Sequence, residues 1–266
     1  LAFIRPVWTA VFVITFDLYW VIRISYLTTL LVFAHRRLEK GKQIDWLKRC
    51  QMLGPMDGLE YKNIYQAVLF PTYKEGLDIL RASISALEDA NYSKDKIIVV
   101  LSVEERAGEE VWQNALVLSR NYSNTFFQFL VTRHPDNIPG EARVKGANAT
   151  WGAKALKGFI DSKGIDYEHV IISCFDADTC PDKNYFSCLA YHFLKNPKRH
   201  QMSFQPLPIY SNNIYSVPAF ARIIEIGSTF WQLMESMRYE KFVTFSSHSM
   251  SFKTLVDVGY WPVNMI

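Results

Sequence analysis

A chain of 266 residues, of which 49% are hydrophobic and 21% charged, is long and apolar enough to build a substantial core, which excludes a disordered chain. The net charge of +3 is small and no stripe of Lys and Arg with interleaved aromatic residues runs along the chain, so nucleic acid is not an expected partner. Four cysteines without a CxxC pair indicate neither a zinc site nor a disulfide framework, and they favour a cytosolic compartment.

The chain begins with an apolar segment, residues 6–34, that exceeds the roughly 20 residues a helix needs to cross a bilayer. Asp17 and Arg23 would each cost about 2.5–3.5 kcal/mol at the bilayer centre, so we expect them to face other helices or an interface. Basic residues follow at once: Arg36, Arg37, Lys40, Lys42, Lys48 and Arg49. The positive-inside tendency then places this flank and the rest of the chain in the cytoplasm. The alternative is a buried helix of a soluble protein.

Residues 41–60 contain three glycines and a proline and predict a linker with little structure. Strands are then expected at 67–70, 97–101, 126–132, from Val170 to the acid at 176, and at 202–205. Helical periodicity separates them, from Leu77 to Leu87, over about 109–119, after Asn148, and from Tyr185 to Phe193. This alternation predicts an α/β fold with a doubly wound, mainly parallel sheet flanked by helices.

An amphipathic stretch, residues 218–238, follows the last of these strands. Its apolar residues, at helical spacing, are Ile223, Ile224, Phe230, Trp231 and Met234. Packing against a core is the expectation for such a helix, and contact with a membrane surface is the alternative.

Two carboxylates one residue apart, Asp176 and Asp178, end the strand that starts at Val170. In an open α/β sheet, ligands bind outside the carboxyl ends of the strands, so this pair is placed to hold a divalent ion. The alternative is a turn in which Asp178 caps a helix that begins near Pro181.

Acidic residues end two other strands: Glu75 follows the first, and Glu104 or Glu105 ends the second. Because the carboxyl ends of parallel strands meet at one edge, we expect these acids to converge with Asp176 and Asp178. Converging carboxylates repel unless Mg²⁺, Mn²⁺ or ligand donors offset their charge. Lys145, in a loop that contains glycine, is a candidate partner for a diphosphate, with a plain surface lysine as the alternative.

Three motifs are absent from the sequence: G-x-G-x-x-G after the first strand, G-x-x-x-x-G-K-[ST] and G-x-S-x-G. Nicotinamide or flavin dehydrogenases, P-loop NTPases and α/β-hydrolases are therefore not expected.

Three segments in this order resemble motifs of the inverting family 2 glycosyltransferases of the GT-A fold, in particular their membrane-bound, processive-synthase-like branch. Pro71-Thr-Tyr-Lys-Glu75 is similar to the family's P-x-Y-x-E, Lys145-Gly-Ala-Asn148 to its K-x-x-N and Asp176-Ala-Asp178 to its D-x-D. The resemblance covers roughly residues 65–266. It implies a membrane-associated helical segment at 1–38, a linker at 39–62 and a GT-A glycosyltransferase domain at 63–266.

The resemblance also implies an activity, namely metal-dependent inverting transfer of a sugar from a UDP- or GDP-sugar to an acceptor hydroxyl at the cytoplasmic face of a membrane. The acceptor would be a polysaccharide or a lipid-linked molecule. The implied donor-binding residues are Pro71, Tyr73, Glu75, Glu104, Lys145, Asn148 and Asp176; Asp176 and Asp178 would hold Mg²⁺ or Mn²⁺; and Ser246, Ser247 and His248 would line the acceptor side.

The sequence departs from the family pattern at two places. The second strand ends in Ser102-Val-Glu-Glu-Arg106 where many members have Asp-Asp-Gly-Ser, so the donor base is not specified by the resemblance. The family's catalytic Asp follows a Gly-x-Trp turn, here Gly259-Tyr-Trp261, and we expect it beyond Ile266, in a longer chain. A nucleotidyltransferase that makes nucleotide-sugars and a non-catalytic nucleotide-binding module are the competing hypotheses.

Overall fold

The computed structural model describes residue 3 and residues 5–209, 218–238 and 247–264. The chain divides into two compact units. The first comprises Leu1–Ile44 with Leu207–Val243, and the second comprises Asp45–Pro206 with Thr244–Ile266. The second unit contains the sheet and the residues that end its strands, so the candidate site belongs to it.

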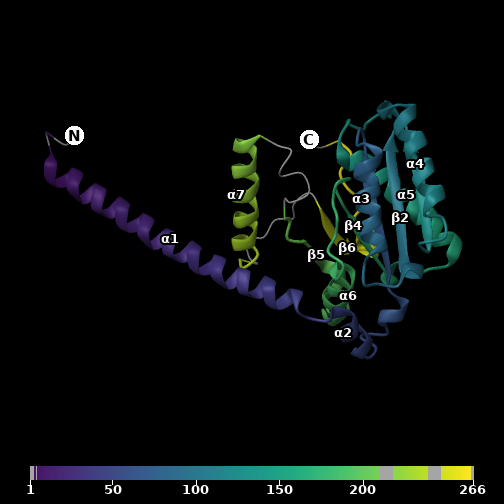
Figure 1. The fold of residues 1–266 in the computed structure, drawn as a ribbon, viewed down its shortest axis with the longest axis horizontal. Helices are drawn as coiled ribbons and strands as arrows, with labels where there is room; N and C mark the ends of the chain where they lie inside the picture. Colours follow the sequence, from purple (N-terminus) through teal and green to yellow (C-terminus); the bar gives the residue numbers. More distant parts are fainter. Residues whose placement is uncertain (1–2, 4, 210–217, 239–246, 265–266) are drawn as a thin grey trace. The chain divides into compact units, whose positions relative to one another are not determined.

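The second unit is built on a six-stranded sheet with the order β3-β2-β1-β4-β6-β5 (Figure 1). Its strands are β1 (Tyr65–Thr72), β2 (Ile97–Glu104), β3 (Gln128–His134), β4 (Val170–Cys174), β5 (Ser203–Phe204) and β6 (His248–Ser251). Strands β1 to β4 are parallel to one another, whereas β6 is antiparallel to both β4 and β5. The carboxyl ends of the four parallel strands therefore share one edge.

The central strands are buried on both faces because helices cover both sides of the sheet. On one side, α3 (Leu77–Glu88), α4 (Glu109–Asn121) and α6 (Tyr185–Lys195) pack with Val68 and Phe70 of β1. On the other side, α5 (Lys145–Lys163) and α8 (Phe252–Asp257) pack with Ala67 and Leu69. Alternate residues of one apolar strand thus fill two cores, as expected for a strand buried in a parallel sheet.

The described part of the second unit also contains five short 3-10 helices: η1 (Tyr61–Asn63), η2 (Lys94–Lys96), η3 (Glu105–Ala107), η4 (Tyr167–His169) and η5 (Arg199–Gln201). The doubly wound, mainly parallel sheet expected from the sequence is confirmed. Its fifth strand is shorter than expected, at two residues.

The expectation that residues 41–60 carry little structure is wrong, because Trp46–Met52 form helix α2. The Asp45 side chain accepts a hydrogen bond from the Lys48 N–H at the start of the helix, at 2.9 Å. Trp46 packs against Tyr191 of α6, with ring centroids 5.4 Å apart, and the Cys50 thiol donates to the Ser187 carbonyl at 3.0 Å. Tertiary packing therefore stabilises a helix that is too short to form alone.

The alternative in which Asp178 caps a helix near Pro181 is also wrong. Helix α6 begins at Tyr185, and Asn184 occupies its N-cap position. Asp178 is exposed and precedes the helix by several residues. Its carboxylate is thus not used as a helix cap.

The first unit contains helix α1 (Pro6–Lys42), whose length and hydropathy are sufficient to cross a membrane. Its 37 residues extend about 55 Å at 1.5 Å per residue, and Ala34 is its only buried residue. The same unit contains α7 (Ala219–Glu235). The core packing expected for residues 218–238 is wrong, because Ile223, Ile224, Phe230 and Trp231 are exposed.

Close packing of α5 on the sheet depends on Gly152. A Cβ atom at Gly152 would lie 2.6 Å from Leu69 Cδ1 and 3.0 Å from Ser102 Cβ. We predict that Gly152→Ala lowers the free energy of unfolding by about 1–3 kcal/mol, since overpacking forces neighbouring atoms apart. The measurement is chemical denaturation of the detergent-solubilised chain, followed by circular dichroism.

Gly158→Ala, in the same helix, is the matched control. A Cβ atom at Gly158 would meet no other atom within 4 Å, so higher helix propensity should stabilise the chain by up to about 1 kcal/mol. Equal unfolding midpoints for the two variants would contradict the packing argument.

Candidate functional site

A cleft of about 390 Å³ opens at the carboxyl ends of the parallel strands. Segments that follow β1, β2 and β4 meet the start of α5 there, although they are separated by up to a hundred residues in sequence. The lining residues are Pro71, Thr72, Tyr73, Glu75, Ile79, Glu104, Lys145, Asn148, Asp176, Ala177 and Asp178. The structure thus brings together around one cleft all the residues that the sequence nominated for donor and metal binding.

Of the three residues nominated for the acceptor side, Ser247 and His248 do not line this cleft. Ser246 lies outside the described residues. Ser247 directly precedes β6, and its hydroxyl oxygen accepts a hydrogen bond from the Asp176 N–H at 3.2 Å. His248 accepts a hydrogen bond from the Trp261 indole N–H at 3.2 Å. Both residues therefore support the region next to the cleft.

Backbone contacts fix the turn that carries the acid pair. The Phe175 N–H donates to the Leu69 carbonyl at 2.9 Å, which ties the end of β4 to β1. The Ser83 hydroxyl donates to the Ala177 carbonyl at 2.7 Å, and the Thr179 N–H closes the turn on the Asp176 carbonyl at 2.9 Å. These contacts thus fix the backbone of the turn that carries the two carboxylates.

Lys145 pairs with Asp176 across the cleft. Both side chains are about 40% exposed, so solvent screens the pair and its contribution to stability is small. The pair places a cation beside the acid pair, at the first residue of α5. The carboxylates could therefore bind a metal ion, and the Lys145 ammonium could offset the negative charge of an anionic ligand bound to that ion.

Two carboxylates with room for other oxygen ligands fit Mg²⁺ or Mn²⁺, which commonly take one or two protein carboxylates and complete their coordination with phosphate oxygens and water. Among the described residues, no group of three or more His, Cys, Asp or Glu side chains is arranged to hold a metal. Burial raises the pKa of the neighbouring Cys174 thiol to about 12 and so disfavours its thiolate, the form that binds metals. Asp176 and Asp178 are therefore the available protein ligands at this turn.

The segment after β1 forms the opposite wall of the cleft. The Glu75 carboxylate accepts a hydrogen bond from the Tyr73 N–H at 2.7 Å and so fixes the loop. The guanidinium of Arg106 lies 4.3 Å from the centroid of the Tyr73 ring, within the range of a cation–π contact. This stack joins the ends of β1 and β2.

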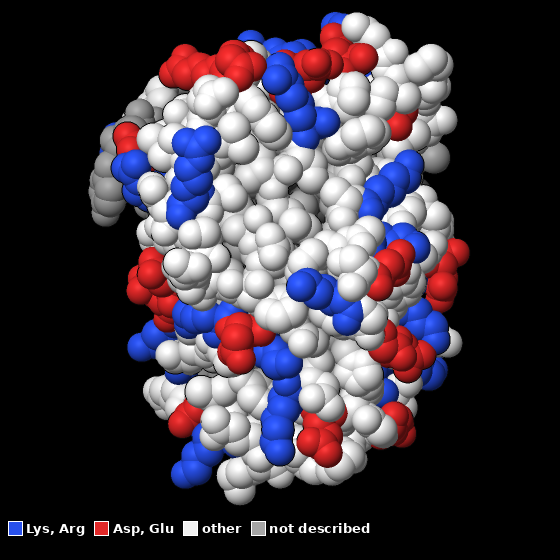
Figure 2. All heavy atoms as spheres, turned by 90° about the vertical axis from the view of Figure 1, so that its right-hand side faces the viewer, with Lys and Arg blue, Asp and Glu red and all other residues white. Residues whose placement is uncertain are grey.

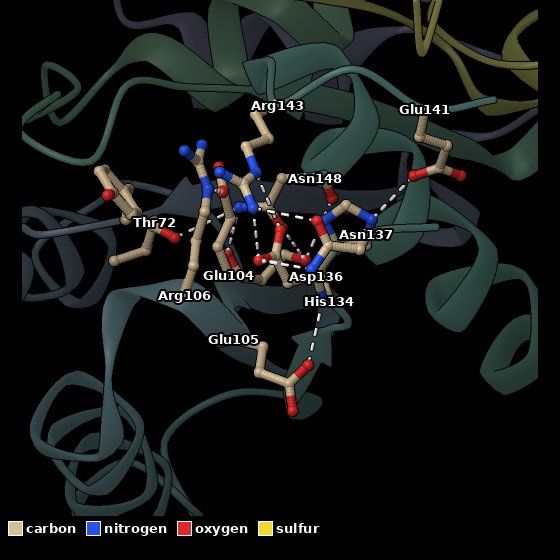
Figure 3. A network of polar contacts seen from close by, with 12 residues as sticks. Thr72, Glu104, Glu105, Arg106, His134, Asp136, Asn137, Glu141, Arg143 and Asn148 are labelled. Atoms are coloured by element: carbon tan, nitrogen blue, oxygen red, sulfur yellow. Dashed lines mark hydrogen bonds and ion pairs between the residues drawn. The ribbon is translucent and has the colours of Figure 1, made fainter. Parts of the chain in front are cut away.

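Glu104 lines both the main cleft and a smaller cavity of about 80 Å³. It belongs to the network of polar contacts drawn in Figure 3. It is 8% exposed and accepts a hydrogen bond from Arg106, which raises the pKa of the guanidinium. Around the smaller cavity, Arg143 binds the carboxylate of Asp136 through two nitrogens, at 3.1 and 2.8 Å. Every charge drawn there has a partner of opposite sign or a hydrogen-bond donor.

Apart from Glu104, sequence reasoning nominated none of the residues that line this smaller cavity. Arg106 stands in the very segment that departs from the family pattern, and that departure was the available signal. His134 ends β3 and pairs at 2.9 Å with Glu141, which lies in a loop whose path the sequence does not indicate. On the face drawn in Figure 2, Lys and Arg are interspersed with Asp and Glu and form no continuous basic stripe.

Asn148 joins three of the segments that form the cleft (Figure 3). Its amide nitrogen donates to the Thr72 carbonyl at 3.3 Å and to the Ser102 carbonyl at 2.8 Å. Its amide oxygen accepts from the Ser102 hydroxyl at 2.8 Å, and the residue is 1% exposed. Asn148 was nominated for donor binding, yet its side chain is engaged with the two strand ends.

The segment after α8 lies against the start of α5, next to the cleft. The Thr150 hydroxyl donates to the Trp261 carbonyl at 3.0 Å, and the Ala142 N–H donates to the Val263 carbonyl at 2.8 Å. A Cβ atom at Gly146 would lie 2.4 Å from the Pro262 carbonyl oxygen, so only glycine permits this approach.

No protein-family description and no curated protein sequence matches this chain. Among solved structures, it is similar to the mannosyltransferase PcManGT from Pyrobaculum calidifontis in complex with GDP-Man and Mn2+, at 12% identity and a TM-score of 0.50. The match covers 92% of this chain and 59% of that one. S. aureus TarS 1-349 in complex with UDP-GlcNAc matches at 14% identity and a TM-score of 0.43, over 75% of this chain and 49% of that one.

The likeness to the mannosyltransferase shows the fold alone. The expected fold class, a GT-A-like mixed α/β domain with an N-terminal apolar helix, is thereby confirmed. The chain spans less than two thirds of the length of that structure.

We predict that Asn148→Asp lowers the free energy of unfolding by about 1–3 kcal/mol. A carboxylate at this position would face the Thr72 and Ser102 carbonyl oxygens without a proton to donate, which leaves buried acceptors unsatisfied. Chemical denaturation of the detergent-solubilised chain at neutral pH measures the effect.

Asn124→Asp is the matched control, because Asn124 is exposed between α4 and β3. Its effect should remain within about 0.5 kcal/mol. The role given to Asn148 would be wrong if both variants unfolded at the denaturant concentration of the parent chain.

Proposed function

We propose that this chain is the catalytic part of a membrane-associated, inverting glycosyltransferase of family 2, and that it uses a nucleotide-sugar donor. The observation that carries the proposal is the convergence of Glu75, Glu104, Lys145, Asp176 and Asp178 on one cleft of a GT-A-like sheet. The carboxylates can accept hydrogen bonds from the hydroxyl groups of a ligand, and the lysine ammonium can pair with its diphosphate. This combination, at the carboxyl ends of parallel strands, suits a nucleotide-sugar.

In this proposal, the donor lies along the cleft from the end of β2 to the acid pair. Pro71, Tyr73, Glu75 and Glu104 contact the nucleoside, since carboxylates accept hydrogen bonds from ribose hydroxyls and ring N–H groups. Lys145 binds the diphosphate. Asn148 acts indirectly, by holding the strand ends that carry these residues.

Asp176 and Asp178 would hold Mg²⁺ or Mn²⁺, and the structure similar to this chain is a complex with GDP-Man and Mn2+. When bound, such an ion supplies positive charge that offsets the charge of a leaving diphosphate. The chain's own residues orient the donor, through the fixed turn at Ala177 and the cation of Lys145. The donor would be a UDP- or GDP-sugar.

A single displacement at the anomeric carbon inverts its configuration, and it needs a base to take the proton of the acceptor hydroxyl. We place that base, an acidic residue, in the longer chain beyond Ile266. The Val263 carbonyl accepts a hydrogen bond from the Ala142 N–H, which ties this end of the described chain to the loop that precedes Lys145. Ser246, Ser247 and His248 stand on the acceptor side, where a polysaccharide or a lipid-linked acceptor would bind.

The membrane part of the proposal rests on α1. Its apolar residues are exposed, and the basic residues Arg36, Arg37, Lys40 and Lys42 gather at its C-terminal end. The positive-inside tendency places that end, and the catalytic residues after it, on the cytoplasmic side.

Asp178→Asn should lower metal-dependent release of nucleoside diphosphate by about 10²-fold or more. The loss of one metal-binding carboxylate removes a few kcal/mol of charge stabilisation, and each 1.36 kcal/mol is tenfold in rate. The measurement is turnover of UDP- and GDP-sugars by the full-length protein in membranes, with Mn²⁺ and with Mg²⁺.

Asp257→Asn, an exposed change in α8, is the control and should retain the parent rate. Unchanged release by Asp178→Asn would remove this residue from the mechanism. Formation of nucleotide-sugar from nucleoside triphosphate and sugar phosphate would instead identify a nucleotidyltransferase.

Lys145→Met should separate metal binding from turnover. Without the lysine, Asp176 loses the cation that competes with the metal ion for its carboxylate. Such a half-exposed ion pair is worth up to about 1 kcal/mol. Mn²⁺ should therefore bind the donor-free protein up to about fivefold more tightly. Turnover should fall, because the diphosphate loses its positive partner. Binding is measured by electron paramagnetic resonance of Mn²⁺.

Lys163→Met, at the opposite end of α5, should change neither quantity. Weaker Mn²⁺ binding by Lys145→Met would show that the lysine supports the metal site rather than competes for it.

A further inference from the structure

Helix α7 turns its apolar face outward. Phe220, Ile223, Ile224, Phe230 and Trp231 lie at helical spacing on one side, and they are between 49% and 73% exposed. Large side chains at i, i+3, i+4 and i+7 normally face a protein core. Here they form an exposed surface, which we name the α7 apolar face.

The opposite side of α7 is polar and partly covered. Arg222, Glu225, Ser228, Thr229 and Gln232 are all of intermediate burial. The helix is therefore inverted relative to one that packs on a water-soluble core, because its polar residues face inward and its apolar residues outward. Such an arrangement requires an apolar medium on the outer side.

Helix α1, in the same unit, indicates what that medium is. The two helices contact each other, and α1 is exposed, apolar and long enough to span a bilayer. A lipid phase that surrounds α1 is the nearest apolar medium available to α7.

The covered part of α1 indicates a depth. Ala34 is the only buried residue of α1. It lies two residues before Arg36, where the basic group that marks the boundary between hydrocarbon and water begins. The covered part of α1 therefore lies at the depth where amphipathic helices rest and where tryptophan is favoured.

We infer that the α7 apolar face inserts into the interfacial zone of the lipid bilayer and forms a second membrane contact of this chain. This contact is independent of sugar transfer and relies only on the membrane insertion of α1. Two contacts at different angles would fix the rotation of the first unit about the membrane normal, which a single helix leaves free.

The test uses spin labels on the full-length protein in nanodiscs of phosphatidylcholine and phosphatidylglycerol, without donor or metal. Labels are attached at Ile223→Cys and, separately, at Phe230→Cys, with the accessible Cys180 and Cys188 replaced by Ser. Both target positions are exposed, so the labels should not disturb folding. Collision rates with oxygen, which partitions into lipid, and with a water-soluble nickel chelate are compared.

The proposal predicts that oxygen collides with both labels several-fold more often than the nickel chelate does, relative to a label at Asn124→Cys, which is exposed shortly after the end of α4. A high nickel collision rate at both positions would overturn the proposal, since the face would then lie in water. Low collision rates with both reagents would also overturn it, in favour of a second copy or another protein segment. None of these outcomes depends on catalysis, so failure here leaves the proposed function untouched.

Discussion

The site depends on the hydrogen bonds of one buried amide, that of Asn148. This side chain connects the ends of β1 and β2 and also belongs to the first turn of α5. Each such hydrogen bond contributes only about 0.5–1.5 kcal/mol, but its loss leaves buried carbonyl groups without a donor. Glu75, Glu104 and Lys145 each lie within three residues of one of its partners or of Asn148 itself. A shift at this point would therefore displace three walls of the cleft together.

Three of the acidic residues in this cleft have a hydrogen-bond donor or a cation beside them. Glu75 accepts from a backbone N–H, Glu104 from Arg106, and Asp176 pairs with Lys145. These internal partners let the acids converge in the absence of ligand, since like charges at close range would otherwise favour protonation. The pairs at Asp176 and Glu104 differ in kind, because the first is solvent-exposed and exchangeable whereas the second is nearly buried.

The sequence predicts the sheet and the shared edge of the site because continuous apolar strands alternate with helices, and parallel strands bring their ends together. It does not predict α2, since that helix depends on packing of Trp46 and Cys50 against α6. Nor does it predict how Asn148 is used, because an amide donates and accepts equally well toward a ligand or toward a backbone. The pairing of Arg106 with both Glu104 and Tyr73 requires a three-dimensional path that local spacing does not contain.

Helix α7 marks the limit of periodicity as evidence. A period of 3.6 residues shows that one face of a helix is apolar, but a protein core and a lipid surface require the same pattern. The direction of the polar face distinguishes them: with Glu225 and Gln232 partly covered and Ile223 and Trp231 exposed, burial in the protein does not account for the apolar residues. A membrane supplies the missing apolar contact at no cost in internal packing. The arrangement of α7 thus agrees with the presence of α1 in the same unit.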